Sequence, residues 1–152
     1  MRRFGVVVVL ALVVVSCGGD GTGDSGNGSG DLPNPCLLVD EDTLLEYFAE
    51  VPTPEAGANG PVVNCTWRDA NANSVLVQVG PVNVFLKPDP CTGCVDLSYG
   101  EEGYAAPSPL QTSAKFVADG VFYSVTTTGM GDDAASISVL GEEVLNAATA
   151  GS

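Results

Sequence analysis

The fold of this chain is set by the stretch KFVADGVFYSVTTT, residues 115–128. Within it, residues 115–118 and 121–128 flank the dipeptide Asp119-Gly120, which is a strong signal for a two-residue turn. The stretch therefore predicts an antiparallel β-hairpin, and the neighbouring segments are interpreted around it.

Segments before the hairpin predict further strands. Residues 62–68 alternate between apolar and polar side chains, which is typical of a half-buried strand. A second alternating strand is expected at 75–79, and residues 82–86 are expected to continue the sheet. Residues 89–109 are rich in proline, glycine and acidic residues, so they predict mostly loop, with one short strand at 95–99.

A first helix is predicted before these strands. Asp40 is its expected cap, and Pro52 and Pro54 are expected to end it. Its apolar face repeats at helical spacing and consists of Leu44, Tyr47, Phe48 and Val51.

A second helix is predicted at the end of the chain. Asp132 or Asp133 is its expected cap, it extends through Asn146, and Gly141 is expected to be a weak point inside it. Its apolar face consists of Ile137, Leu140, Val144, Leu145 and Ala148.

The order of these elements predicts an α+β fold. An antiparallel β-sheet with an N-terminal and a C-terminal helix packed on one face is the economical way to bury the apolar faces of all of them. The opposite face of the sheet is then expected to be solvated or to line a ligand groove.

The first sixteen residues predict a secretory signal. Arg2 and Arg3 precede an apolar run over 4–15, which is too short to cross a bilayer as a helix. Residues 14–17, Val-Val-Ser-Cys, resemble a bacterial lipobox, so Cys17 is the expected first mature residue and the lipid attachment site. The alternatives are an uncleaved membrane helix and an ordinary secreted protein cut near Ser16.

The signal divides the chain into three parts. Residues 1–16 are the expected signal peptide, and residues 17–31 are the lipidated cysteine with a flexible tether of Gly, Ser and Asp. Fourteen such residues span about 20 Å root-mean-square. Residues 32–152 are expected to form a single domain, held by its lipid at the extracytoplasmic face of the cell membrane.

The mature chain is strongly acidic. Only Arg68, Lys87 and Lys115 remain against 19 Asp and Glu residues once the signal is removed. Nucleic-acid binding and attraction to anionic lipid both need clustered Lys and Arg, so the composition excludes both.

Four cysteines remain besides Cys17, and an oxidising location allows three pairings of them. We expect Cys91 to pair with Cys94, because Gly93 permits a tight turn between them, and Cys36 to pair with Cys65. The alternatives are a redox-active Cys91/Cys94 pair and a zinc site made by all four thiolates.

The sequence predicts no catalytic, cofactor or metal site. It contains no histidine, so a Ser-His-Asp or Cys-His site is impossible. The adjacent acidic pairs 101–102, 132–133 and 142–143 are the candidates for a carboxylate enzyme, but adjacent side chains rarely face each other across a substrate. The acidic residues in 20–31 do not match a calcium loop, and Trp67 is expected in the core.

Several short motifs resemble a known family. Pro35-Cys36-x-Leu38 with an acidic helix start, then Cys65-Thr66-Trp67, a hairpin and a closing Asp-Ala helix resemble a lipoprotein family common in actinobacteria that is classed as a domain of unknown function. The resemblance covers residues 32–146. It implies an envelope lipoprotein with an α+β fold and a Cys36–Cys65 disulfide, and it implies no established activity.

Three classes of function are compatible with these observations. The first is an extracytoplasmic, non-enzymatic binding or interaction module for a small ligand or an envelope protein. The second is a carboxylate-based hydrolase, and the third is a structural component of the envelope. A concave apolar pocket beside the sheet favours the first class, and two carboxyl groups facing across a cleft favour the second.

Overall fold

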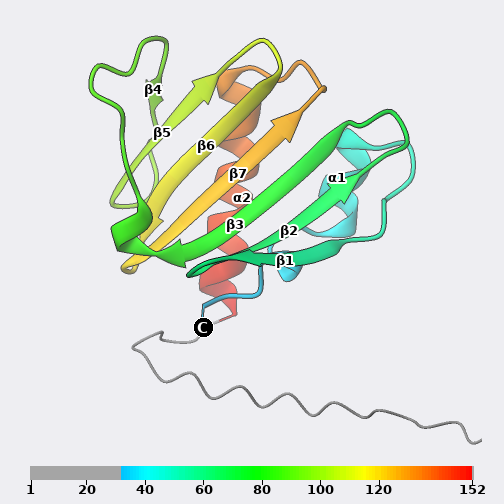
Figure 1. Cartoon of the computed structure of the whole chain (residues 1–152), viewed down its shortest axis with the longest axis horizontal. Helices are drawn as coiled ribbons and strands as arrows, with labels where there is room; N and C mark the ends of the chain where they lie inside the picture. Colours follow the sequence, from blue (N-terminus) through cyan, green and yellow to red (C-terminus); the bar gives the residue numbers. More distant parts are fainter. Residues whose placement is uncertain (1–31, 152) are drawn as a thin grey trace, which may run out of the picture.

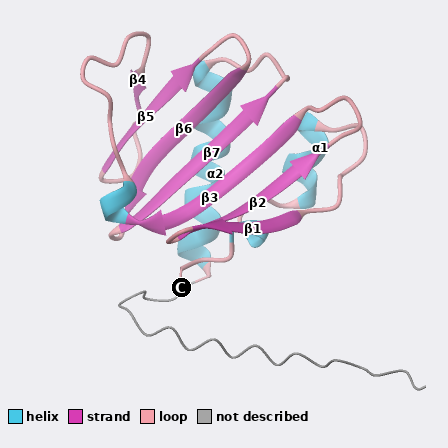
Figure 2. Ribbon diagram, in the orientation of Figure 1, coloured by secondary structure: helices cyan, strands magenta, loops and turns pink. Residues whose placement is uncertain are grey.

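The computed structural model describes residues 32–151, which form one antiparallel seven-stranded sheet with two helices. The strand order is β1-β2-β3-β7-β6-β5-β4, and both helices lie behind the same face of the sheet (Figures 1 and 2). The predicted α+β class is confirmed. The strands are β1 (Glu55–Asn59), β2 (Val62–Arg68), β3 (Ser74–Pro81), β4 (Val95–Asp96), β5 (Glu102–Pro107), β6 (Gln111–Ala118) and β7 (Val121–Thr128).

The predicted hairpin forms the middle of the sheet. Strands β6 and β7 pair from Ala118↔Val121 outward, and β7 also pairs with β3 along its whole length. Asp119 and Gly120 have φ angles of 51° and 72°, which is the geometry of the turn that matches strand twist. The local turn signal therefore placed two of the three central strands correctly.

The core lies between the sheet and its two helices. Alternate residues of the central strands point toward the helices, and Val75, Val77 and Val125 are fully buried there. The C-terminal helix α2 (Ala134–Ala150) contributes Ile137 and Val144 to the same cluster. Trp67 is 2% exposed, which confirms its predicted place in the core.

The first helix, α1 (Glu41–Tyr47), is shorter than the sequence predicts. Asp40 caps it as expected, and its side chain accepts a hydrogen bond from the Thr43 N–H at 2.7 Å. Phe48 is already extended, with φ −126° and ψ 140°, so the helix ends before Val51 and the prolines. The reason is tertiary: the turn at Phe48 leaves its ring 4% exposed against the core.

The second helix resolves the choice between its two candidate caps. The Asp133 carboxylate accepts hydrogen bonds from the N–H and the Oγ of Ser136, and the helix runs four residues past Asn146. Gly141 is not a weak point. A Cβ built there would collide with the Tyr99 hydroxyl and lie 3.2 Å from the Ala114 Cβ, so the helix approaches the sheet closely because this residue lacks a side chain.

Two strands of the structure were not predicted from the sequence. The first is β1, which pairs with β2 through a turn at Gly60-Pro61, and the second is β5, which pairs with β6. The β1 sequence EAGAN contains no β-branched or aromatic residue, and β5 lies in a segment rich in Gly and acid. Pairing with a stronger neighbour, rather than intrinsic preference, makes both of them strands.

One predicted strand segment is absent and another is shortened, whereas the predicted strand 115–118 is longer and forms β6. Residues 82–86 do not continue the sheet, because η2 (Val82–Val84) is a 3₁₀ turn that leads the chain across the face opposite the helices. There the Phe85 ring contacts Tyr104 at 6.1 Å and Phe122 at 6.2 Å between ring centroids, and the Tyr104 hydroxyl donates to the Leu86 carbonyl at 3.1 Å. The strand predicted at 95–99 is reduced to β4.

Candidate functional site

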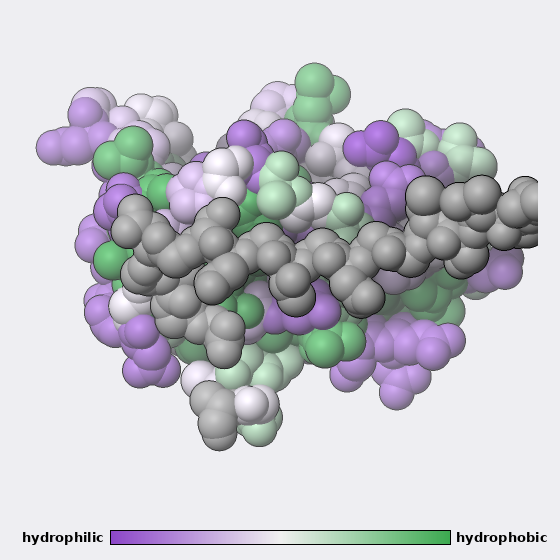
Figure 3. All heavy atoms as spheres, turned by 60° about the horizontal axis from the view of Figure 1, so that its bottom comes forward, coloured by the Kyte–Doolittle hydropathy of each residue, from purple (hydrophilic) through white to green (hydrophobic). Residues whose placement is uncertain are grey.

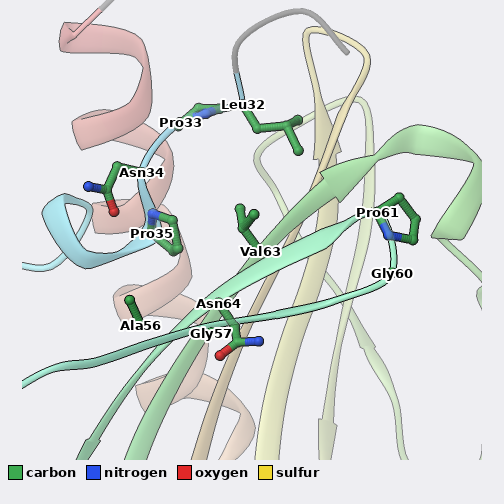
Figure 4. A pocket seen from close by; sticks show the side chains of 10 residues that line it. All are labelled: Leu32, Pro33, Asn34, Pro35, Ala56, Gly57, Gly60, Pro61, Val63 and Asn64. Carbon is green, nitrogen blue, oxygen red and sulfur yellow. The ribbon is translucent and has the colours of Figure 1, made fainter. Parts of the chain in front are cut away.

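An open pocket of about 540 Å³ lies beside the β1 edge of the sheet. One wall is the entering segment 32–35, and the other is the β1–β2 hairpin with its turn (Figure 4). The side chains of Leu32 and Val63 point into the space between the walls. The pocket is lined by Leu32, Pro33, Asn34, Pro35, Ala56, Gly57, Gly60, Pro61, Val63 and Asn64.

The first wall is held in place by local geometry and by a covalent bond. Pro33 and Pro35 restrict the backbone, and the Asn34 side chain accepts a hydrogen bond from the Cys36 N–H at 3.0 Å, which caps η1 (Pro35–Leu37). Cys36 is disulfide-bonded to Cys65 of β2, with their Cα atoms 5.1 Å apart. The expected pairing is therefore present, and it ties the wall of the pocket to the sheet.

The second wall is built from small residues. Ala56 and Gly57 supply almost no side-chain bulk, and a Cβ on Gly57 would come within 2.9 Å of the Asn64 Oδ1. Asn64 therefore lies over Gly57 on the face away from the helices. Gly60 has a φ of 60° at the hairpin turn, which favours glycine at that position.

None of the ten lining residues carries a charge, although the domain around them is strongly acidic. Leucine, prolines and valine supply apolar contacts, and Asn34 and Asn64 supply the polar ones. A pocket of this size with few polar groups suits an uncharged ligand. Among the residues that the structure describes, this lining offers a charged ligand no partner for its charge.

A second uncharged hollow adjoins the first at the same end of the domain. It has a volume of about 430 Å³ and lies between the entering segment and the end of α2. Leu37, which is 76% exposed, lines it together with Ala147 and Ala148. Seen from this end, hydrophobic and hydrophilic groups are mixed on the visible face (Figure 3).

Two carboxylates share a third hollow, of about 450 Å³, next to the end of α1. These are Glu50 and Asp69, and they are not among the adjacent acidic pairs that the sequence singled out. The Asp69 oxygens accept hydrogen bonds from the N–H groups of Asn71 and Asn73 and from the Asn73 side chain. Burial raises the pKa of Asp69, but these bonds outweigh it and the pKa is lowered, so the carboxylate stays ionised and holds the turn.

Among the adjacent acidic pairs that the sequence singled out, some carboxylates make structural contacts and others lie away from these hollows. Asp133 caps α2, and its hydrogen bonds from Ser136 hold its pKa below the usual range. Glu143 accepts a hydrogen bond from the Thr43 hydroxyl at 3.1 Å, which joins the two helices. Neither Glu101 nor Glu102 lines any of these hollows.

The second pair of cysteines is also bonded. Cys91 and Cys94 form a disulfide in the loop before β4, and the Cys94 N–H donates to the Cys91 carbonyl at 3.3 Å. The loop is far in sequence from any helix start, unlike a thioredoxin-type pair. The bonded pairs leave no four-thiolate zinc site, and no cluster of three metal-ligating side chains occurs in residues 32–151.

Two half-buried tyrosines have strongly shifted pKa values. Burial raises the pKa of Tyr47 to about 12, and the nearby carboxylates of Asp132, Glu143 and Glu46 add to the shift. Burial also raises the pKa of Tyr99 to about 12, although the nearby Ser138 lowers it in part. Both phenols pack between the helices and the sheet, so these shifts report packing rather than a reactive group.

Some predictions fall outside the described residues, namely the signal peptide, the tether and lipidation at Cys17. Within residues 32–151, no helix is both long and apolar enough to cross a membrane. No protein-family model, curated protein or solved structure matches the chain.

The pocket beside β1 was not predicted from the sequence. Its second wall is β1, which was not predicted, although Gly60, at the first position of the two-residue turn Gly60-Pro61, is a hairpin signal that could have revealed it. The approach of residues 32–35 to that strand has no local signal, because these segments are joined only through the Cys36–Cys65 bond and tertiary packing.

Proposed function

We propose that the protein is a lipid-anchored envelope lipoprotein, similar to the actinobacterial family named above, that acts as an extracytoplasmic binding module. In this proposal, Cys17 carries the lipid and the pocket beside β1 receives an uncharged, largely apolar ligand. The observation that carries the binding role is the uncharged lining of that pocket in a strongly acidic chain. The hydrolase alternative has weaker support, because Asp69 of the Glu50/Asp69 hollow is committed to a turn.

The anchor and the pocket lie close together in the chain. Leu32 lines the pocket, and only residues 18–31 separate it from Cys17. A glycine-rich segment of that length has a root-mean-square span of about 20 Å, so the pocket would stay near the outer surface of the membrane. A ligand or partner within the envelope would then be met at high local concentration.

The anchor predicts a change of cell fraction when Cys17 is replaced. In the Cys17→Ser variant, the protein is expected to lose its lipid and to leave the membrane fraction, because two acyl chains supply the binding energy and the acidic domain supplies none. The measurement is fractionation of a producing actinobacterium followed by immunoblotting and mass spectrometry of the N-terminus. Cys91→Ser is the control, and equal membrane retention of the Cys17→Ser protein would refute the anchor.

The pocket predicts that an added charge weakens the binding of an uncharged apolar probe. We expect Leu32→Asp to weaken the affinity of the mature protein for Nile red by about tenfold, since the carboxylate is unpaired within an apolar lining. Fluorescence titration measures this affinity. The matched control is Leu110→Asp, because Leu110 is 79% exposed in the turn between β5 and β6, at the opposite end of the sheet from the β1–β2 turn. Equal affinity of both variants would show that the dye binds elsewhere.

A further inference from the structure

The two edges of the sheet differ in how they are protected against pairing. The β4 edge is two residues long, and its Asp96 forms an ion pair with Lys87 at 2.6 Å. The β1 edge is five residues long and all five residues are exposed; it contains neither proline nor lysine, and its one charged residue is Glu55 at its start. Short length and charge commonly protect an edge strand against pairing with another strand. By this measure β4 is better protected than β1.

The hairpin turn shows which backbone groups of β1 are free to pair. The β1–β2 ladder closes at Asn59↔Val62 across a two-residue turn, and this closing pair is the hydrogen-bonded type. Hydrogen-bonded pairs alternate along the ladder, so Ala56 and Ala58 direct their N–H and C=O groups away from β2. Figures 1 and 2 show β1 at the border of the sheet, where β2 is its neighbour in the described part of the chain.

The open edge and the pocket are continuous. Ala56 and Gly57 belong to β1 and also line the pocket, whose other wall is the segment 32–35 (Figure 4). An added strand would therefore place every second side chain over the helix-side wall of the pocket, because side chains alternate between the faces of a sheet. Leu32, Pro35 and Val63 would meet those side chains with apolar surface.

The charge of the domain and the area of the β1 edge favour a separate peptide as the occupant over a second copy of the chain or the chain's own residues 18–31. A second copy would bring together two domains of the same strong negative charge, and a five-residue edge of about 17 Å offers much less area than a stable dimer needs. The chain's own residues 18–31 contain no apolar side chain and three aspartates, so they suit an uncharged apolar pocket poorly. A separate peptide with apolar side chains and basic flanks complements both the pocket and the acidic surroundings.

We propose, on the basis of the binding role proposed above, that the ligand is an extended peptide segment of another protein that adds to β1 as an eighth strand. Its main chain pairs with the outward N–H and C=O groups of Ala56 and Ala58. Its alternate apolar side chains enter the pocket, and its basic flanks face Glu55 and the acidic domain. Main-chain pairing supplies affinity, and the uncharged pocket supplies selectivity.

The test uses three short end-blocked peptides and the mature protein labelled for NMR. The first peptide is Lys-Val-Thr-Val-Thr-Val-Lys, the second has proline in place of its central valine, and the third has glutamate in place of both lysines. We expect the first to shift the amide signals of Ala56 and Ala58 and to slow their hydrogen exchange. The proline peptide is expected to bind at least about tenfold more weakly because it cannot complete a strand, and the acidic peptide is expected to bind more weakly because of repulsion.

A pair of variants separates main-chain pairing from surface chemistry. Ala58→Pro removes one outward N–H and is expected to weaken binding of the first peptide by at least about tenfold. Ala58→Thr keeps that N–H and is expected to bind within about twofold of the unchanged protein. Unchanged amide signals of α2 show that each variant is folded, and the proline peptide tests the same point without any substitution.

Three outcomes would overturn the inference. The first is equal binding of the proline peptide, the second is equal binding by the Ala58→Pro protein, and the third is a set of shifted amides away from β1. Phosphatidylcholine vesicles are tested without peptide, and shifts at β1 caused by vesicles alone would make this end a membrane-docking surface instead. If Leu32→Asp still weakens Nile red binding by about tenfold, the proposed binding role survives the failure of strand addition.

Discussion

Removing the disulfide between Cys36 and Cys65 is expected to lower the free energy of unfolding by about 3–4 kcal/mol. The two cysteines are 29 residues apart in sequence, so the bond removes much of the freedom of the unfolded chain. Cys65 is also fully buried in the core, where its loss leaves fewer contacts. The double variant Cys36→Ala/Cys65→Ala tests this expectation by chemical denaturation of the non-reduced protein.

The second disulfide supplies the control. Cys91 and Cys94 are three residues apart, and the loop-closure argument gives their bond about 2 kcal/mol, roughly half the effect of the first. The Cys91→Ala/Cys94→Ala variant also lies away from the pocket, so Nile red affinity is expected to be unchanged there. In Cys36→Ala/Cys65→Ala the affinity is expected to fall, because the wall at residues 32–35 is no longer tied to β2. Equal stability losses in the two variants would contradict the account.

Replacing Gly141 by alanine is expected to destabilise the domain by about 1–3 kcal/mol. The same change in an exposed helix interior usually stabilises it by about 1 kcal/mol, so the expected sign is reversed. The reason is the close approach of α2 to the sheet, where a Cβ would collide with the Tyr99 hydroxyl and crowd Ala114. Thermal and chemical unfolding of the purified variant measure both the sign and the size.

A double variant identifies the clash. Tyr99→Phe removes the hydroxyl that the new Cβ would meet and keeps the ring packed edge-on against Phe116, with the centroids 5.2 Å apart. In that background, Gly141→Ala is expected to cost less, and the difference between the two backgrounds measures the contact. The cost is expected to remain above zero, because Ala114 still lies 3.2 Å away. A stability gain from Gly141→Ala alone would disprove the close-packing role of this glycine.

The comparison of Gly141 with Asp133 shows where sequence reasoning succeeds and fails. Asp133 was predicted as one of two caps, because a cap acts on the backbone three residues away and its signal is local. Gly141 was predicted as a weak point for the same kind of reason, namely its helix propensity. Its actual role depends on Tyr99, which lies 42 residues earlier, so no local pattern could reveal it.

The pocket beside β1 was likewise predictable only in part from the sequence. The pairing of Cys36 with Cys65 was expected, and it is the bond that creates one wall of the pocket. The other wall is β1, whose residues EAGAN have weak strand preference and become a strand by pairing with β2. The pocket could not be predicted because it needs both walls, and only one of them had a signal in the sequence.

The sequence by itself therefore determined the local structure, through the alternation in 62–68 and 75–79, the Asp119-Gly120 turn and the Asp40 cap. The low number of basic residues determined the acidic character of the chain. These signals act over a few residues, or over the composition as a whole, and need no knowledge of distant neighbours. Only the tertiary structure decided four other features. These are the end of α1 at Phe48, the strands β1 and β5, the close approach of Gly141 to the sheet, and the pocket beside the β1 edge. Each of these depends on contacts between segments that are far apart in sequence, where packing and pairing outweigh the preference of the segment itself.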